Sequence, residues 1–199
     1  MKKFVVNRCV NFILKYNPEY SNTTIEEIKY GVATLYNFFI KCLIIFPAAY
    51  FLNIFKEFII FCIIYNIIRI PSFGLHATTN MICAISSLII FTVVPYISIL
   101  IEINPVIQIL VILLSSILLI VNSPADTKKR PIINKKRRKI YKFMTFILCV
   151  VYILVFIVAN NLLLKNIIMF SLILQSILTS PITYRLFKLP YNNYLNYVQ

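Results

Sequence analysis

Six apolar segments, separated by short polar or proline-containing breaks, restrict what this chain can fold into. They cover residues 32–55, 58–70, 81–101, 105–121, 143–159 and 166–184. A helix needs about 20 apolar residues to cross the hydrocarbon core of a bilayer. The pattern therefore predicts an all-α integral membrane protein with about six transmembrane helices, folded as one membrane-embedded domain over residues 1–199.

The composition excludes the main alternatives to a membrane protein. The chain has 199 residues, of which 60% are hydrophobic and only 13% are charged, whereas soluble domains carry about 25% charged residues. Such high hydrophobicity also excludes an intrinsically disordered chain. The five cysteines are scattered and there is one histidine. The sequence therefore predicts no disulfide framework, no metal site and no cofactor.

The basic residues are unevenly distributed, which predicts the orientation in the membrane. The chain has 20 Lys+Arg against 6 Asp+Glu, a formal net charge of +14. With both termini in the cytoplasm, seventeen of the 20 basic residues lie on the cytoplasmic side, as the positive-inside rule requires. We therefore expect a multi-pass protein of the bacterial plasma membrane with cytoplasmic N- and C-termini. Four spans with two re-entrant or interfacial hairpins would give the same sidedness.

Two polar segments lie outside the predicted spans. Residues 1–30 begin with a basic amphipathic stretch, which is expected to form an interfacial helix on anionic membrane lipids. Thr23 and Thr24 then precede Glu26 and Glu27 by three residues, a capping-box pattern that predicts the start of a helix leading into the first span. Residues 122–142 carry nine basic residues and are expected to anchor to lipid headgroups. They lack the fold of a nucleic-acid-binding domain, so no nucleic acid partner is expected.

The candidate chemical site is the connection after the second apolar segment, where the only histidine lies. His76 follows Gly74, one of two glycines in the chain, and Cys83 stands seven residues further on. If Thr79 or Asn80 caps the next helix, Cys83 falls in its first turn. There the helix dipole and free backbone N–H groups favour a thiolate. A nearby imidazole would act as the base or as the cationic half of an ion pair.

Spacing alone does not bring these two side chains together. Residues seven apart in one continuous helix are separated by about 10.5 Å along its axis, so a contact between His76 and Cys83 requires a bend or a new helix between them. The same spacing fits an ordinary buried cysteine and a solvated loop histidine. Other polar residues of the apolar segments are expected to form interhelical hydrogen bonds. These are Gln108, Ser115, Ser116, Gln175 and Ser176. Lys41 is costly within a span unless it faces protein or reaches the interface.

Three features of the sequence occur together in one known family. The first is Arg69 followed by Gly74-Leu75-His76-Ala77 and, at a fixed interval, Cys83. The second is the opening of the basic segment, Ser123-Pro124-Ala125-Asp126-Thr127-Lys128. The third is the plan of the whole chain, with a basic amphipathic N-terminus and paired spans on either side of the basic segment. Together they resemble the accessory gene regulator protein B (AgrB) family of Gram-positive quorum-sensing systems. Family members often have Gly-Gly before the histidine, where this chain has Phe73-Gly74.

The resemblance implies a membrane cysteine endopeptidase that cleaves an AgrD-type propeptide and promotes its cyclisation to a thiolactone or lactone through an acyl-enzyme. It implies that His76 and Cys83 form the catalytic pair at the cytoplasmic side and that the protein is a homodimer. Arg69 and Gly74 are expected to support the pair. Asp126 is a candidate to orient His76 only if the basic segment folds back beneath the site.

The acidic C-terminal part of such a propeptide would meet the basic segment. The candidate substrate-binding residues are Lys128, Lys129, Arg130, Lys135, Lys136, Arg137 and Arg138. The rival interpretation is a non-enzymatic membrane protein, either a peptide exporter or an assembly scaffold. Only the enzyme requires the thiol of Cys83, so this residue distinguishes the two.

Overall fold

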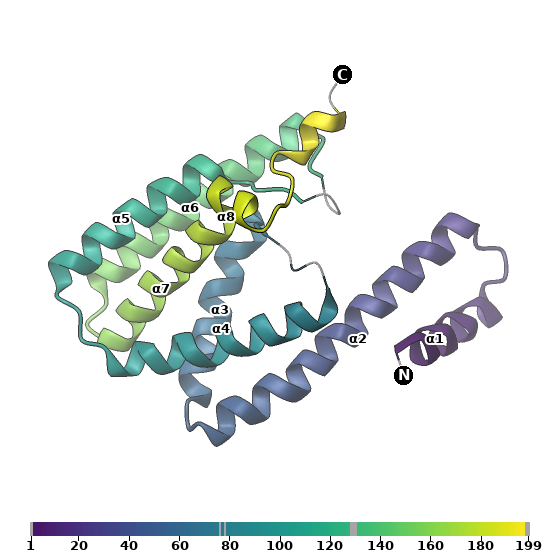
Figure 1. Ribbon diagram of the computed structural model, residues 1–199, viewed down its shortest axis with the longest axis horizontal. Coiled ribbons are helices and arrows are strands. Elements are labelled where there is room, and N and C mark those ends of the chain that lie inside the picture. Colours follow the sequence, from purple (N-terminus) through teal and green to yellow (C-terminus); the bar gives the residue numbers. More distant parts are fainter. Residues whose placement is uncertain (1, 76, 78, 128–130, 198–199) are drawn as a thin grey trace.

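The computed structural model describes residues 2–75, 77, 79–127 and 131–197, and helices dominate it (Figure 1). The helices are α1 (Lys2–Tyr16), α2 (Asn22–Phe51), α3 (Phe55–Ser72), α4 (Asn80–Leu100), α5 (Pro105–Asn122), α6 (Lys135–Val158), α7 (Leu162–Thr179), α8 (Pro181–Leu186) and the 3-10 helix η1 (Asn193–Tyr197). An isolated β-bridge pairs Phe73 with Ala125. The predicted all-α fold is confirmed.

Five helices, α2, α4, α5, α6 and α7, are long and apolar enough to cross a membrane. The expected sixth span, 58–70, corresponds to α3, which has 18 residues and contains Lys56, Glu57 and Arg69. α3 packs against α2, α4, α6 and α7, and it lies among them in Figure 1. Because so much of its surface faces protein, α3 can carry more charge than a helix surrounded by lipid.

The N-terminal arm consists of α1 and the first half of α2, which extends away from the other helices (Figure 1). α1 packs on α2 and buries Val6 and Val10. The cap of α2 differs from the expected capping box. Ser21, in an extended conformation, accepts a hydrogen bond from the backbone N–H of Thr24 at 3.2 Å. A cap needs non-helical backbone dihedrals. Since Thr23 and Thr24 already lie inside the helix, neither can be the cap.

The last predicted span, 166–184, is divided in two. α7 ends at Thr179, Ser180 is extended, and Pro181 begins the short helix α8. A proline has no backbone N–H and disfavours helical geometry in the residue before it. The Ser180 hydroxyl then caps α8 by accepting from the N–H of Ile182. Tyr184 is therefore carried by a separate helix.

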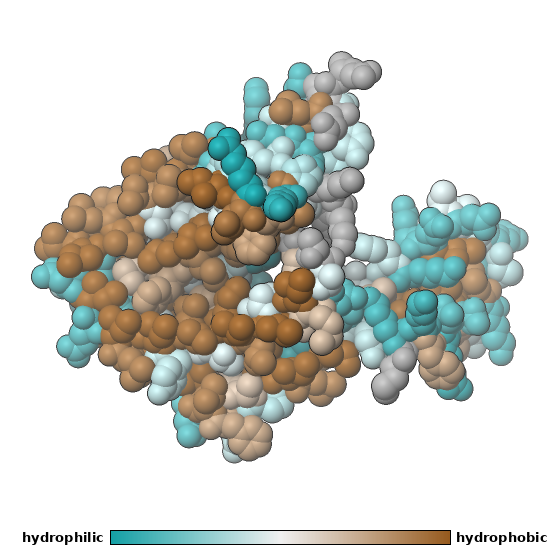
Figure 2. All heavy atoms as spheres, viewed as in Figure 1, coloured by the Kyte–Doolittle hydropathy of each residue, from teal (hydrophilic) through white to brown (hydrophobic). Residues whose placement is uncertain are grey.

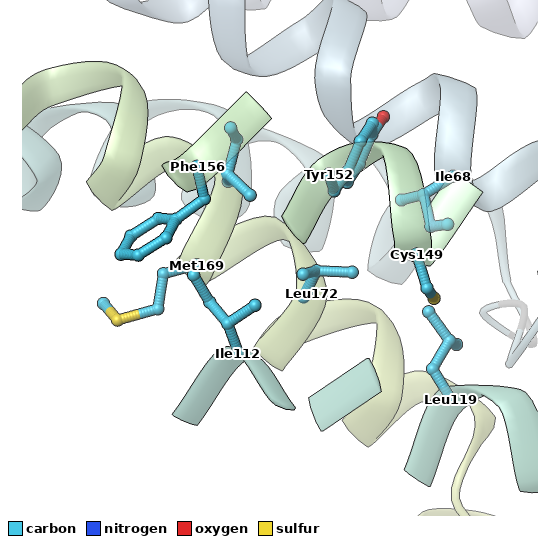
Figure 3. Close-up of a cluster of buried hydrophobic side chains, with 9 residues drawn as sticks. Ile68, Ile112, Leu119, Cys149, Tyr152, Phe156, Met169 and Leu172 are labelled. Carbon is cyan, nitrogen blue, oxygen red and sulfur yellow. The ribbon is translucent and has the colours of Figure 1, made fainter. Parts of the chain in front are cut away.

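The largest core lies between α3, α5, α6 and α7 (Figure 3). Its buried members are Ile68, Ile112, Leu119, Cys149, Tyr152, Phe156, Ile168, Met169 and Leu172. On the face seen in Figure 2, hydrophobic atoms cover most of the bundle, and hydrophilic atoms gather over α1 and at the end near the C-terminus. Exposed apolar surface of this extent is typical of a surface that meets lipid.

A buried amide joins three helices at the opposite end of the bundle from the basic segment. Asn166 of α7 donates hydrogen bonds to the carbonyls of Ser98 and Ile101, at 2.9 and 2.8 Å. Its own oxygen accepts from the side-chain amide of Gln108 at 2.7 Å. The last carbonyls of a helix have no partner within the helix. Asn166 therefore satisfies the end of α4 where water is excluded.

Replacing Asn166 by Leu is expected to destabilise the protein by roughly 1–3 kcal/mol, because two carbonyls and an amide lose their buried partner. Thermal unfolding in detergent micelles measures the change. Asn66 is the matched control, since it is exposed and donates only within its own helix. The interpretation is wrong if Asn66→Leu lowers the unfolding temperature as much as Asn166→Leu does.

Candidate functional site

The connection between α3 and α4 is held by backbone hydrogen bonds to two distant segments. The N–H of Gly74 donates to the carbonyl of Ala125 at 2.9 Å, and the N–H of Ala125 donates to the carbonyl of Ser72 at 3.0 Å. The N–H of Leu75 donates to the carbonyl of Leu178 at 2.9 Å. We call residues 72–75, Ala125 and the end of α7 the junction. It joins segments from three parts of the sequence.

Gln175 of α7 completes the junction from within. Its fully buried side-chain amide donates to the Ser72 hydroxyl at 2.7 Å and to the Phe73 carbonyl at 2.6 Å. Gln175 is thus the interhelical hydrogen-bond partner that the sequence predicts, and so is Gln108. Ser176 instead donates to the carbonyl of Ile173 in its own helix.

The backbone of Phe73 and Gly74 explains why this position favours glycine. Gly74 has φ +110°, and a Cβ added there would lie 3.1 Å from the carbonyl oxygen of Leu178. Phe73 has φ +59°, a conformation that is strained for a bulky residue. The Phe73 ring packs edge-on against Tyr141 at 5.0 Å between centroids. This contact offsets part of the strain.

Arg69 supports the same connection from α3. Its guanidinium donates to the Leu75 carbonyl at 3.4 Å and to the hydroxyl of Tyr65, and it lies over the Tyr65 ring. Leu75 is therefore held through both its N–H and its carbonyl. His76, the predicted base, lies outside the described residues, so its distance to Cys83 is not part of this geometry.

Cys83 lies in the first turn of α4, as expected. Thr79 is the cap, and its hydroxyl accepts from the N–H of Ile82 at 3.2 Å. The N–H of Cys83 donates to the Thr79 carbonyl at 3.0 Å. The thiol is partly exposed, whereas Cys149 is fully buried in the main core. Cys83 therefore lies outside the buried clusters.

A lysine from another helix contacts this thiol. Lys41 of α2 places its Nζ 2.9 Å from the Sγ of Cys83, and both residues are partly buried. One turn earlier on both helices, the side chain of Asn37 donates to that of Asn80 at 3.3 Å. The sequence marks Lys41 only as a costly cation in an apolar segment. Its pairing with Cys83 depends on how α2 and α4 cross, and the spacing of residues in the sequence does not predict that crossing.

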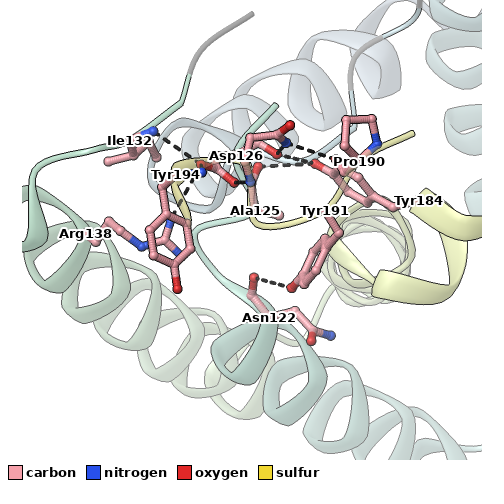
Figure 4. A network of polar contacts seen from close by, with 10 residues as sticks. Asn122, Ala125, Asp126, Ile132, Arg138, Tyr184, Pro190, Tyr191 and Tyr194 are labelled. Atoms are coloured by element: carbon pink, nitrogen blue, oxygen red, sulfur yellow. Dashed lines mark hydrogen bonds and ion pairs between the residues drawn. The ribbon is translucent and has the colours of Figure 1, made fainter. Parts of the chain in front are cut away.

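Asp126 is buried and organises the basic segment and the C-terminal tail (Figure 4). Its carboxylate accepts hydrogen bonds from the backbone N–H groups of Ile132, Asn193 and Tyr194, at 3.3, 3.1 and 2.9 Å. Arg138 lies 3.6 Å from the same carboxylate. The described partners of Asp126 are the chain's own backbone and Arg138.

Tyr184 of α8 fixes the backbone on which Asp126 sits. Its hydroxyl donates to the carbonyls of Ala125 and Asp126, at 3.3 and 3.2 Å. Burial, followed by the nearby carboxylate of Asp126, raises the pKa of Tyr184 above that of an exposed tyrosine. The hydroxyl therefore stays protonated and available as a donor. This role of Tyr184 carries no signal in the sequence.

The predicted substrate-binding cations fall into three groups. Lys128, Lys129 and Arg130 lie outside the described residues. Lys135, Lys136 and Arg137 are exposed in the first turn of α6. Arg138 is partly buried, with its guanidinium 3.5 Å from the centre of the Tyr194 ring. Arg138 is therefore a structural partner of Asp126 and Tyr194.

An open pocket lies beside Arg138 and is lined by more cations. Its volume is about 330 Å³, and its walls combine the start of α6 with the C-terminal tail. Lys139, Lys142 and Tyr191 contribute side chains to it. Its cations and hydrogen-bond donors suit an anionic group.

Comparison with known proteins adds independent information. The profile of the family described as Accessory gene regulator B matches residues 6–179. An AgrB-like protein of Clostridium acetobutylicum is 27% identical over 186 residues, which cover 92% of this chain and 89% of that protein. Accessory gene regulator protein B of a bovine strain of Staphylococcus aureus is 30% identical over 131 residues, 65% of this chain and 70% of that protein. No solved structure matches significantly.

The two glycines of the chain provide a matched test of the junction. Gly74→Ala is expected to destabilise the protein by about 1–3 kcal/mol, since it combines a left-handed φ with a close approach to backbone. Gly31 lies within α2 with nothing within 4 Å of an added Cβ. Gly31→Ala should stabilise by about 0.5–1 kcal/mol. Unfolding in detergent measures both, and shifts of the same sign would contradict the proposed geometry.

Proposed function

The chain belongs to the accessory gene regulator B family, and from this membership we propose that it is a membrane cysteine peptidase of quorum sensing. Its substrate would be an AgrD-type propeptide, cleaved and cyclised to a thiolactone or lactone. The position of Cys83 carries the proposal, because a partly exposed thiol in the first turn of a capped helix is placed for nucleophilic attack.

The proposed reaction proceeds through an acyl-enzyme. The thiolate of Cys83 attacks the scissile carbonyl, an S–C bond forms, and the peptide C–N bond breaks. His76 holds the proton released by the thiol and delivers it to the amine of the departing C-terminal fragment. A cysteine or serine within the propeptide then attacks the thioester, which closes the ring and restores the thiol of Cys83.

The setting of Cys83 supports ring closure over hydrolysis. Met81, Ile82 and Ile85 expose large apolar side chains around it on α4. Lipid or the propeptide covering these side chains would limit the access of water to the thioester. The junction holds Leu75, the residue immediately before His76, through its N–H and its carbonyl.

The first turn of α6 supports recognition of an acidic segment. Lys135, Lys136 and Arg137 stand at the positive end of the helix dipole, with no acidic residue in that turn. Such a placement opposes helix stability. An anionic partner outside the helix, either lipid headgroups or the acidic part of the propeptide, explains why the cations are there.

The same face of the molecule would lie in the cytoplasm. The first turns of α4 and α6 and the ends of α3, α5 and α7 lie at one end of the bundle, together with the junction. Since most cations lie in the segments at this end or in the N-terminal arm, the positive-inside rule supports a cytoplasmic site.

Replacing Cys83 by Ala or Ser is expected to reduce propeptide cleavage more than about 1000-fold, because the nucleophile is lost. The C-terminal fragment is measured by mass spectrometry after membranes are incubated with the co-encoded propeptide. Cys62→Ala, also a partly buried cysteine, should retain activity. Undiminished cleavage by both Cys83 variants would favour the exporter or scaffold.

Replacing Lys135, Lys136 and Arg137 together by Gln should weaken propeptide capture by about 3- to 30-fold, with a smaller effect at high salt. Arg138 is left unchanged because it pairs with Asp126. Capture is measured with liposomes of neutral lipid, and single-turnover cleavage of bound propeptide should change little. Removing three cations from α1, at Lys2, Lys3 and Lys15, is the matched control. If the α6 and α1 substitutions weaken propeptide capture equally, or if they change only the membrane topology, the α6 cations serve only to set the orientation in the membrane.

A further inference from the structure

We propose that Lys41 is the charge partner of Cys83, with its ammonium group holding the sulfur as a thiolate for attack. No role for Lys41 follows from the sequence motifs or from the pairing of His76 with Cys83. The inference deepens the proposed function and rests on it for the catalytic consequence. The contact itself rests on the packing of α2 against α4.

α2 and α4 pack along a line of contacts, the seam, which is polar at one end and apolar further along. Asn37 and Lys41 are four residues apart on α2, and Asn80 and Cys83 are three apart on α4, so each pair shares one helix face. These faces meet through the hydrogen bond from Asn37 to Asn80 and the contact from Lys41 to Cys83. The seam is therefore polar at this end, and it aligns the ammonium with the sulfur.

The seam continues as an apolar contact. On α2, four and eight residues beyond Lys41, Ile45 and Ala49 are buried in a cluster against which Leu88 and Phe91 of α4 pack. Ala49 is fully buried, and its small side chain permits close approach of the helices. This packing fixes the crossing of α2 and α4, so the position of the Lys41 ammonium does not depend on the polar contacts alone.

The surroundings of Lys41 indicate what its charge is for. It lies among apolar residues in a helix of membrane-spanning length, where a lysine is costly. Within the described part of the chain the one ion pair joins Arg138 to Asp126, so no described carboxylate pairs with Lys41. The polar atom that faces the ammonium is the sulfur of Cys83, at 2.9 Å. A thiolate at Cys83 would balance the positive charge of the partly buried Lys41, whereas a neutral thiol would not.

The proposed division of labour leaves proton transfer to His76. Lys41 interacts with the sulfur electrostatically and takes no part in proton transfer. When the S–C bond forms, the negative charge moves from sulfur to the carbonyl oxygen of the tetrahedral intermediate, close to the same ammonium. Preorganised positive charge at that point lowers the barrier to acylation.

The test measures the reactivity of Cys83 directly, in the full-length protein in detergent. Initial alkylation by iodoacetamide, a neutral reagent, is followed at pH 7 by mass spectrometry, with Cys62 in the same molecule as the internal reference. Lys41→Met should slow alkylation of Cys83 about 10-fold or more and leave that of Cys62 unchanged. Lys41→Arg, which keeps the charge, should stay within about threefold of the original rate. Lys165→Met removes a lysine elsewhere and should have no effect.

Two alkylation results would overturn the inference. One is an unchanged alkylation rate of Cys83 in Lys41→Met, and the other is an equal fall for Cys62, which would indicate a structural effect. Cleavage and binding separate this inference from the proposed function. In a Cys83→Ala background, Lys41→Met should leave propeptide binding unchanged. If alkylation behaves as expected but the unsubstituted protein does not cleave the propeptide, the proposed function fails and the charge pair stands. Cys83-dependent cleavage that persists undiminished in Lys41→Met would refute the role of Lys41.

Discussion

The paired backbone of residues 72–74 and Ala125 holds the arrangement at one end of the bundle. Where helices end beside lipid, freed N–H and C=O groups need partners within the protein. Here the end of α3 finds them in the basic segment, and Leu75 finds its partner in α7. Gln175 supplies the last donor from the interior. The α3–α4 connection, the α5–α6 connection and the end of α7 are thus joined by hydrogen bonds into one structure next to the start of α4.

The sequence predicts the features that depend on one helix at a time. The apolar segments, the cap at Thr79 and the position of Cys83 in a first turn all follow from local patterns. Even local patterns compete, as Ser21 shows by capping α2 just before the expected threonines. The division at Ser180 also has a visible cause in Pro181, which ends one helix and begins another with its own cap.

Local sequence patterns do not predict which residues of different helices come into contact. Lys41 and Cys83 are 42 residues apart, and they meet where α2 packs against α4. The partners of Asp126 likewise depend on where the tail crosses the basic segment. Phe73 is an intermediate case. The bulky residue before Gly74 is visible in the sequence, but the ring of Tyr141 that packs beside the strained backbone is not.

The partners of Asp126 also impose an order on synthesis. The carboxylate is made early, whereas two of its backbone donors, at Asn193 and Tyr194, come 67 and 68 residues later. Until that tail has left the ribosome, the carboxylate has only water, Arg138 and the N–H of Ile132 as partners, so its burial is energetically more costly. The basic segment thus becomes anchored only after α6 and α7 have been made. The junction next to Cys83 is completed among the last steps of assembly, when the rest of the bundle is already in place.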